Sequence, residues 1–348
     1  MTKKDQSTIE SRMAALDEGR LSDAKEAAIE PDLPIVDPHH HLWDFRSHRY
    51  LLDELLSDLD SGHRIEKTVY MECAAFYRQS GDPHMRFLGE VEFVNGVAAM
   101  AASGRYGQTL VAAGIVGMAD LTLGAAVEDV LTAQLACSGE RFKGIRYAAA
   151  REDKTNEIHN SHTNPPEHLY LDHPAFREGF AKLGQLNLSF DAWVYHPQLG
   201  ELIDLATAFP DQPIVLNHVG GPLGLGYYAS RKAQVFEQWS AQIQQLARRE
   251  NVCIKLGGLG MLLNGFGFEN RTAAPSSTEL ADAWKPFIHT AIEAFGAHRC
   301  MFESNFPVDK ISGSYGNYWN AFKRLAADAS NDEKFLLFKG TAERFYRL

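Results

Sequence analysis

The most informative stretch of this sequence is a short motif, DPHHHLWD, which spans residues 37–44. Residues two apart on a β-strand point to the same side, so His39 and His41 can present both imidazoles to one cation. A divalent metal held by neutral imidazoles brings the pKa of a bound water to about 7 and thereby creates a nucleophile. His40 faces the other way, which indicates packing or hydrogen bonding. The motif therefore predicts a catalytic pair, His39 and His41.

Other ionisable residues lie near the ends of other apolar runs, on the side opposite the apolar residues. Glu72 is assigned in this way because Val69, Met71 and Cys73 form the apolar set of its run. Burying many charged groups is costly unless they pair, bind a metal or line a cavity, so the set predicts an active site. The predicted inner-face set is Asp37, His39, His41, Glu72, Arg146, Asp191, His218, Lys255, Glu303 and Asn305.

Arg146 offers a fork of N–H donors that matches a carboxylate. It is predicted to anchor the substrate, with Tyr195 and Glu72 as further substrate-binding residues. An internal ion pair of Arg146 with Glu72 or Asp191 stays open as the alternative.

Two further groups of residues point to structural roles. Lys255 and Glu303 lie on neighbouring runs, which favours an ion pair between them. A loop at residues 151–173 contains several histidines beside Asn and Pro, a composition that is more typical of a solvated loop than of a catalytic one. These loop histidines are His159, His162, His168 and His173.

The elements that must position these residues alternate along the chain. Short β-branched or apolar runs occur at residues 34–42, 67–74, 110–118, 142–148, 188–195, 213–219, 252–257 and 299–306. Helical patterns between them include residues 124–135, 175–184, 197–208, 234–249 and 280–295. About eight strand–helix units in one chain predict a single (β/α)₈ TIM barrel. A doubly wound open sheet is the structural alternative, but no G-x-G-x-x-G follows the first run.

In a barrel of this kind the loops that follow the strands carry the active site. Four of these connections are long, at residues 151–173, 220–233, 260–275 and 307–318. Loops of this length in a compact domain are usually lids or disordered segments, and we expect lids.

Composition excludes several classes of protein. The chain has 348 residues, 45% of them hydrophobic, and 34 Lys and Arg against 45 Asp and Glu give a net charge of −11. That length is ample for a large core, and the acidic balance argues against nucleic-acid or membrane-surface binding. Four cysteines without a C-x-x-C spacing favour a reducing compartment. With no apolar leader or spanning stretch, we expect a cytoplasmic protein.

The chain divides into two predicted parts. Residues 1–32 are polar and form an N-terminal arm, either an amphipathic helix or a disordered tail. Residues 33–348 form the barrel domain. The expected partner is a small-molecule substrate, and a homo-oligomer stays open.

Four segments resemble the amidohydrolase-related family of TIM-barrel metal-dependent hydrolases, and most closely its sugar-lactone and pyrone-dicarboxylate lactonase branch. The segments are residues 37–44 (DPHHHLWD), 143–146 (KGIR), 216–222 (LNHVGGP) and 301–307 (MFESNFP). The resemblance implies hydrolysis of a lactone or related carboxylic ester. It also implies that His39, His41 and His218 are the family's strand-end histidines, and that Arg146 matches an arginine that holds a substrate carboxylate.

One departure from the family pattern bears on the metal. The family's last strand usually ends in G-S-D-[WF]-P, whereas this chain has Asn305 in place of the aspartate and Glu303 in place of the glycine. An amide cannot act as a general base. Metal-free catalysis is therefore preferred, while zinc or manganese held by His39, His41 and His218 stays open.

The resulting hypothesis is a lactonase for a carboxylate-bearing cyclic or aromatic-derived substrate. His218 or a metal polarises the carbonyl, and a metal or a carboxylate activates the water. The candidate carboxylates are Glu303, Glu72 and Asp309. A non-oxidative metal-dependent decarboxylase, or a degenerate barrel that only binds a ligand, is the alternative. The predicted catalytic residues are His39, His41, His218, Glu303 and Asn305.

Overall fold

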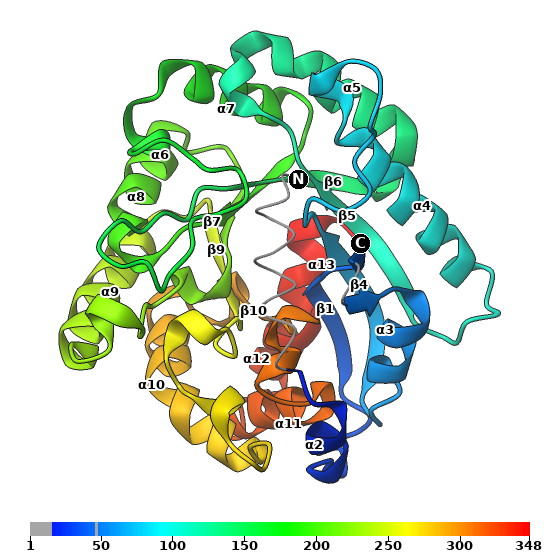
Figure 1. Cartoon of the computed structure of the whole chain (residues 1–348), viewed down its shortest axis with the longest axis vertical. Coiled ribbons are helices and arrows are strands. Elements are labelled where there is room, and N and C mark those ends of the chain that lie inside the picture. Colours follow the sequence, from blue (N-terminus) through cyan, green and yellow to red (C-terminus); the bar gives the residue numbers. More distant parts are fainter. Residues whose placement is uncertain (1–15, 46–47) are drawn as a thin grey trace.

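A computed structural model describes residues 16–45 and 48–348 of the chain. Within this part, eight parallel strands form one sheet in sequence order, with helices around it (Figure 1). The strands are β1 (Pro34–His40), β4 (Arg64–Met71), β5 (Leu110–Gly117), β6 (Phe142–Ala148), β7 (Ser189–Trp193), β8 (Ile214–Leu216), β9 (Val252–Leu256) and β10 (Cys300–Phe302). A parallel bridge between His40 and Phe306 joins the two edges. The predicted (β/α)₈ barrel is confirmed.

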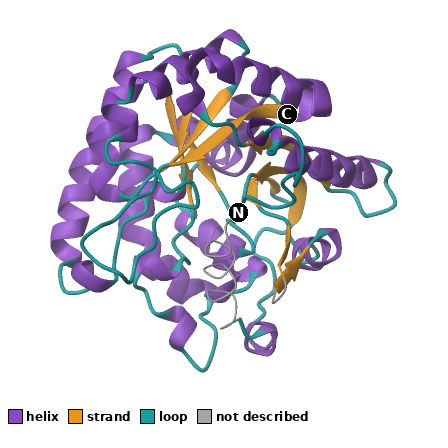
Figure 2. Cartoon of the chain, turned by 45° about the horizontal axis from the view of Figure 1, so that its top comes forward, coloured by secondary structure: helices purple, strands orange, loops and turns teal. Residues whose placement is uncertain are grey.

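Helices cover the outside of the barrel, as Figure 2 shows. The longer ones are α3 (Leu52–Leu59), α4 (Leu88–Ala102), α5 (Val127–Ser138), α7 (Pro174–Gln185), α8 (Leu199–Ala208), α9 (Lys232–Leu246), α10 (Ser277–Phe295) and α11 (Tyr315–Leu325). The shorter ones are α2 (Glu18–Asp23), α6 (Leu169–Asp172), α12 (Asn331–Phe335) and α13 (Thr341–Tyr346). A small antiparallel hairpin, β2 (Trp43–Phe45) and β3 (His48–Tyr50), follows β1. None of the helices described is long and apolar enough to cross a membrane.

Part of the predicted N-terminal arm, residues 1–15, lies outside the described residues. The described part contains α2, in which Leu21 and Arg20 are buried. The Arg20 guanidinium donates to the backbone carbonyls of Phe268, Arg271 and Ile311. The arm is therefore fastened to the loops that follow β9 and β10.

The inside of the barrel is filled at one end by a small apolar cluster. Its members come from six strands and from α13, and they are Val36, Val69, Met71, Val116, Val215, Cys253, Met301, Ala342, Phe345 and Tyr346. The helix α13 thus closes the barrel from below, on the side opposite the strand-end loops. We call this interior cluster the plug. The site must lie on its other side, toward the loops that follow the strands.

Two assignments of side-chain direction were wrong. Val69 and Met71 belong to the interior cluster, not to the helix-facing side. Glu72 nevertheless enters the site, because β4 ends at Met71 and the chain turns beyond it. Asp37 accepts a hydrogen bond from Tyr315 of α11, so it points outward. A break in pairing register between Asp37 and His40 explains why Asp37 and His39 do not share a face.

The long loops pack against one another at the mouth of the barrel. Their apolar side chains form a second small cluster, separate from the main core, which we call the mouth cluster: Ala150, Ile158, Tyr195, Leu223, Tyr228, Val235, Met261 and Leu263. Loops with a core of their own hold defined positions. The loops after β6, β8 and β9 therefore form a cover over the strand ends.

Candidate active site

The carboxylate of Glu303, just beyond β10, lies at the centre of the site. Its Oε1 is 2.7 Å from His218 Nδ1 and accepts the backbone N–H of His218 at 2.9 Å. Its Oε2 is 2.7 Å from His39 Nδ1. Glu303 is fully buried, as is His39, and His218 is nearly so. One carboxylate therefore joins the ends of β1, β8 and β10.

His41 supplies a second set of contacts beside His39. Its Nδ1 lies 2.8 Å from the Met71 carbonyl, so Nδ1 carries the proton and Nε2 carries a lone pair. This Nε2 is 3.2 Å from His39 Nε2 and 3.3 Å from Asn305 Oδ1. The free nitrogen of His41 thus faces the same small volume as His39 and Asn305.

Asn305 is held in place from behind. Its amide Nδ2 donates to Asp309 Oδ1 at 2.7 Å, which turns its Oδ1 toward His41. Asp309 Oδ2 accepts the backbone N–H of Gly260 at 2.9 Å. Burial raises the pKa of Asp309 above its ordinary value, and both of its oxygens accept hydrogen bonds, so neither oxygen is free to serve as a base.

Arg146 pairs with Glu72, one of the two alternatives that the sequence left open. Arg146 Nε donates to Glu72 Oε1 at 2.8 Å, and Nη2 donates to the Glu72 carbonyl. The remaining nitrogen, Nη1, lies 3.4 Å from His39 Nε2. On the other side, His162 Nε2 is 3.3 Å from Glu72 Oε2. A chain of polar contacts therefore links the loop at residues 151–173 to His39.

Below the histidines lies a second buried ion pair. Lys255 Nζ is 2.8 Å from Asp191 Oδ1 and 3.3 Å from His39 Nδ1. The Tyr346 hydroxyl, from the plug, donates to the same Asp191 oxygen at 2.7 Å. The predicted pairing of Lys255 with Glu303 is replaced by this one, because Asp191 on β7 also points inward.

The three histidines are neutral near pH 7. Burial lowers the pKa of His39 and of His41 well below the ordinary value, and the charges of Lys255 and Arg146, respectively, lower it further. Burial also lowers the pKa of His218, and Glu303 offsets part of that effect. Neutral imidazoles are the form that binds metals and accepts protons.

Among the described residues, one group of three has metal-ligating atoms that all lie within 4.8 Å of one another: His39, His218 and Glu303. This group differs from the predicted metal set, since Glu303 joins it and His41 stands beside it. Glu303 reaches both histidines.

The remaining substrate-site candidate, Tyr195, belongs to the mouth cluster. Its hydroxyl donates to the His159 carbonyl at 2.5 Å, and its ring meets Trp193 edge-on. Trp193 in turn meets the His218 ring at 4.6 Å between centroids. Trp193 is partly exposed and contacts the His218 ring directly.

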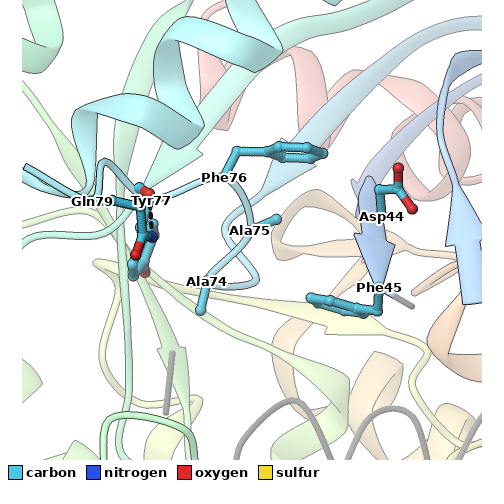
Figure 3. Close-up of a pocket in the computed structure, with 7 residues that line it drawn as sticks. All are labelled: Asp44, Phe45, Ala74, Ala75, Phe76, Tyr77 and Gln79. Atoms are coloured by element: carbon cyan, nitrogen blue, oxygen red, sulfur yellow. Dashed lines mark hydrogen bonds between the residues drawn. The ribbon is translucent and has the colours of Figure 1, made fainter. Parts of the chain in front are cut away.

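A cavity of about 130 Å³ opens beside the site, between β2 and the loop after β4 (Figure 3). It is lined by Asp44, Phe45, Ala74, Ala75, Phe76, Tyr77 and Gln79. None of the histidines discussed above is in this lining. The catalytic set itself is closed: His39, His41, His218 and Asn305 are at most 3% exposed.

One contact with the site was missed from the sequence. His162 was grouped with the other loop histidines as solvated, but it reaches Glu72 across the mouth. Nothing in its local sequence separates it from its neighbours. Its position depends on how the loop folds back onto β6.

The amidohydrolase family matches residues 36–348 of this chain. The chain belongs to this family and is an enzyme of the amidohydrolase superfamily.

Three proteins with known names or structures are similar to this chain. A Sinorhizobium fredii protein named y4mH is 32% identical over 91% of this chain and 99% of its own length. An L-fucono-1,5-lactonase of Burkholderia ambifaria is 27% identical over 57% of this chain and 63% of its own length. The crystal structure of a Burkholderia multivorans amidohydrolase with bound zinc has a TM-score of 0.68 at 22% identity, covering 90% of this chain and 99% of its own. The last likeness supports the fold.

The site predicts a large effect of removing each histidine. His39→Ala, His41→Ala and His218→Ala should each lower kcat/KM by at least about a hundredfold, the scale of lost acid–base or oxyanion assistance. Steady-state kinetics measures this, and far-ultraviolet circular dichroism checks folding. His168→Ala is the matched control, because His168 is 53% exposed and pairs with Glu167 and Glu201, neither of which is among the site residues named above. Near-wild-type activity in two of the three variants would contradict the assignment.

Proposed function

We propose that this enzyme hydrolyses a lactone by adding water to the ring carbonyl. The observation that supports the proposal most strongly is the convergence of three neutral histidines and one carboxylate above the barrel plug, beneath a cover of packed loops. The relatives named L-fucono-1,5-lactonase support the same chemistry.

The donor set of the site fits a divalent cation. Two imidazoles and a carboxylate are ligands that catalytic zinc uses. The Oε2 oxygen of Glu303 is buried and faces His39 Nδ1 at 2.7 Å without an aligned hydrogen bond, so it keeps a lone pair for a cation. His39, His218 and Glu303 would hold the ion. When bound, it would polarise the carbonyl and lower the pKa of a water.

The carboxylate needed to balance the charge of a cation is therefore present despite Asn305. We accordingly propose a metal-assisted reaction, in place of the metal-free one that the missing aspartate had favoured. Glu72 and Asp309 are not available as bases, since Glu72 is held by Arg146 and His162, and the oxygens of Asp309 are occupied by Asn305 and Gly260.

The chain's own residues orient the reactants. His41 Nε2 and Asn305 Oδ1 are both acceptors, so a water beside them donates to each and turns its lone pair toward the carbonyl carbon. His41 Nε2 then takes the proton of that water. Arg146 Nη1 is the guanidinium nitrogen that Glu72 leaves free, and it can stabilise the oxyanion. Such a donor lowers the activation free energy by roughly 3–4 kcal/mol.

The pairing of Arg146 also bears on the substrate. Two of its three nitrogens are engaged by Glu72, so the guanidinium has no free fork for a carboxylate. We therefore propose a neutral six-membered lactone of the sugar-lactone type rather than the carboxylate-bearing substrate expected from Arg146 alone.

A panel of lactones tests the function directly. It contains L-fucono-1,5-lactone, D-glucono-1,5-lactone, δ-valerolactone, dihydrocoumarin and 2-pyrone-4,6-dicarboxylate, with acid release followed by a pH indicator. We expect hydrolysis of a neutral lactone and little of the dicarboxylate. Release of carbon dioxide from an aromatic carboxylic acid, without acid release from any lactone, would replace the proposal with a decarboxylase.

Removal of metal should inactivate the enzyme. Prolonged treatment with a strong chelator should lower kcat by at least about a hundredfold, and addition of zinc or manganese should restore it, because the neutral histidines would be left without their Lewis acid. Metal content is measured in parallel by elemental analysis. Full activity in protein shown to be metal-free would contradict the metal-assisted reaction and leave the histidine site intact.

A further inference from the structure

A buried carboxylate that the reaction above does not use lies beside the site. Glu72 is fully buried, and its second oxygen, Oε2, has no well-aligned hydrogen bond. The atom that faces it is His162 Nε2, 3.3 Å away and also buried without a well-aligned hydrogen bond. Burial alone would raise the pKa of Glu72, but the charges of His162 and Arg146 lower it. Glu72 thus holds the His162 ring by its Nε2 atom on one side and the Arg146 guanidinium on the other.

The loop that carries His162 is anchored on both sides of it. The Ser161 N–H donates to the Ala150 carbonyl at 2.8 Å, and the Thr163 hydroxyl donates to the Ala148 carbonyl. Farther out, the Glu152 N–H donates to Asn160 Oδ1 at 2.7 Å. These bonds fold the loop back onto the end of β6, so His162 is held over the strand that carries Arg146.

His162 also lies where solvent and site meet. Its side chain is 24% exposed, whereas Glu72 beneath it is inaccessible. With Nε2 turned to Glu72, its Nδ1 is the nitrogen available to a ligand. His162 therefore reaches from solvent to the Glu72–Arg146 pair, and Arg146 in turn contacts His39.

We propose that His162, backed by Glu72, is the proton donor to the leaving oxygen of the lactone. The assignment rests on the proposed lactone hydrolysis. A bond forms between the water oxygen and the carbonyl carbon, and the water proton goes to His41 Nε2. The ring carbon–oxygen bond breaks, and the ring oxygen takes the proton from His162 Nδ1. His41 then loses a proton to solvent and His162 regains one, so the net change is the addition of one water.

A carboxylate behind an imidazole is the arrangement that general acid–base catalysis uses to hold the ring and to stabilise its charged form. A proton donor is needed only when the leaving oxygen is a poor leaving group. An alkoxide needs it, whereas a phenolate, with a conjugate acid of pKa about 10, leaves far more easily. This difference separates a proton donor from a residue that merely supports the loop.

The test compares two six-membered lactones in the His162→Gln variant. For the aliphatic lactone that the panel ranks first, kcat/KM should fall by about a hundredfold, the usual contribution of a general acid. For dihydrocoumarin, whose leaving group is a phenolate, it should fall by less than about fivefold. His162→Ala should behave in the same way, because neither side chain can transfer a proton. His168→Gln, in the same loop, should change neither rate.

The outcomes are distinguishable. An equal loss of kcat/KM with both lactones would show that His162 only supports the loop. No loss of kcat/KM with either lactone would show that His162 has no role. Both results overturn the assignment and leave the proposed function standing. If the wild-type enzyme hydrolyses no lactone of the panel, the proposed function is wrong and the assignment is overturned with it. Thermal unfolding of each variant shows whether a loss of activity comes from a loss of structure or from the missing proton donor.

Discussion

The site depends on one buried charge, the carboxylate of Glu303. Taking a carboxylate out of water costs several kcal/mol unless its oxygens are matched by donors or a cation. Here the matching groups are His39, from the end of β1, and His218, which uses both its ring and its backbone N–H. The charge thus orders the ends of three strands, and removing either histidine would leave it exposed to an apolar interior.

The backbone around this carboxylate is shaped to let the groups approach. His218 and Asn305 have positive φ angles of 57° and 56°, which few non-glycine residues adopt, so the chain turns sharply just after β8 and β10. Gly258, after β9, lies so close to His218 that a Cβ there would come within 2.4 Å of the histidine Cβ. The strands end early, and the site is built from the residues that follow them.

The sequence predicted the parts that depend on alternation and on motif. The barrel, the inward direction of Arg146 and Lys255 and the positions of His39 and His41 all follow from side-chain periodicity along strands. The direction of Asp37 did not, because the register of β1 breaks beside it. Whether Arg146 would pair with Glu72 or with Asp191 depended on strand register and on the plug, which places Tyr346 against Asp191 and leaves Glu72 to Arg146. The contact of His162 with Glu72 could not be predicted in this way, because it depends on how the loop folds back and not on the local sequence.

The most direct measurement is kcat/KM for Glu303→Gln and for the double variant Glu303→Gln/Asn305→Asp, with a neutral lactone and folding checked for both. If the buried Glu303 carboxylate organises the histidines, kcat/KM of the single variant should fall by at least about a hundredfold. This is the scale of the loss of an acid–base or electrostatic group. The double variant should have a kcat/KM at least about tenfold higher than the single variant, since it restores a carboxylate two residues away. Wild-type activity in the folded single variant would contradict the account.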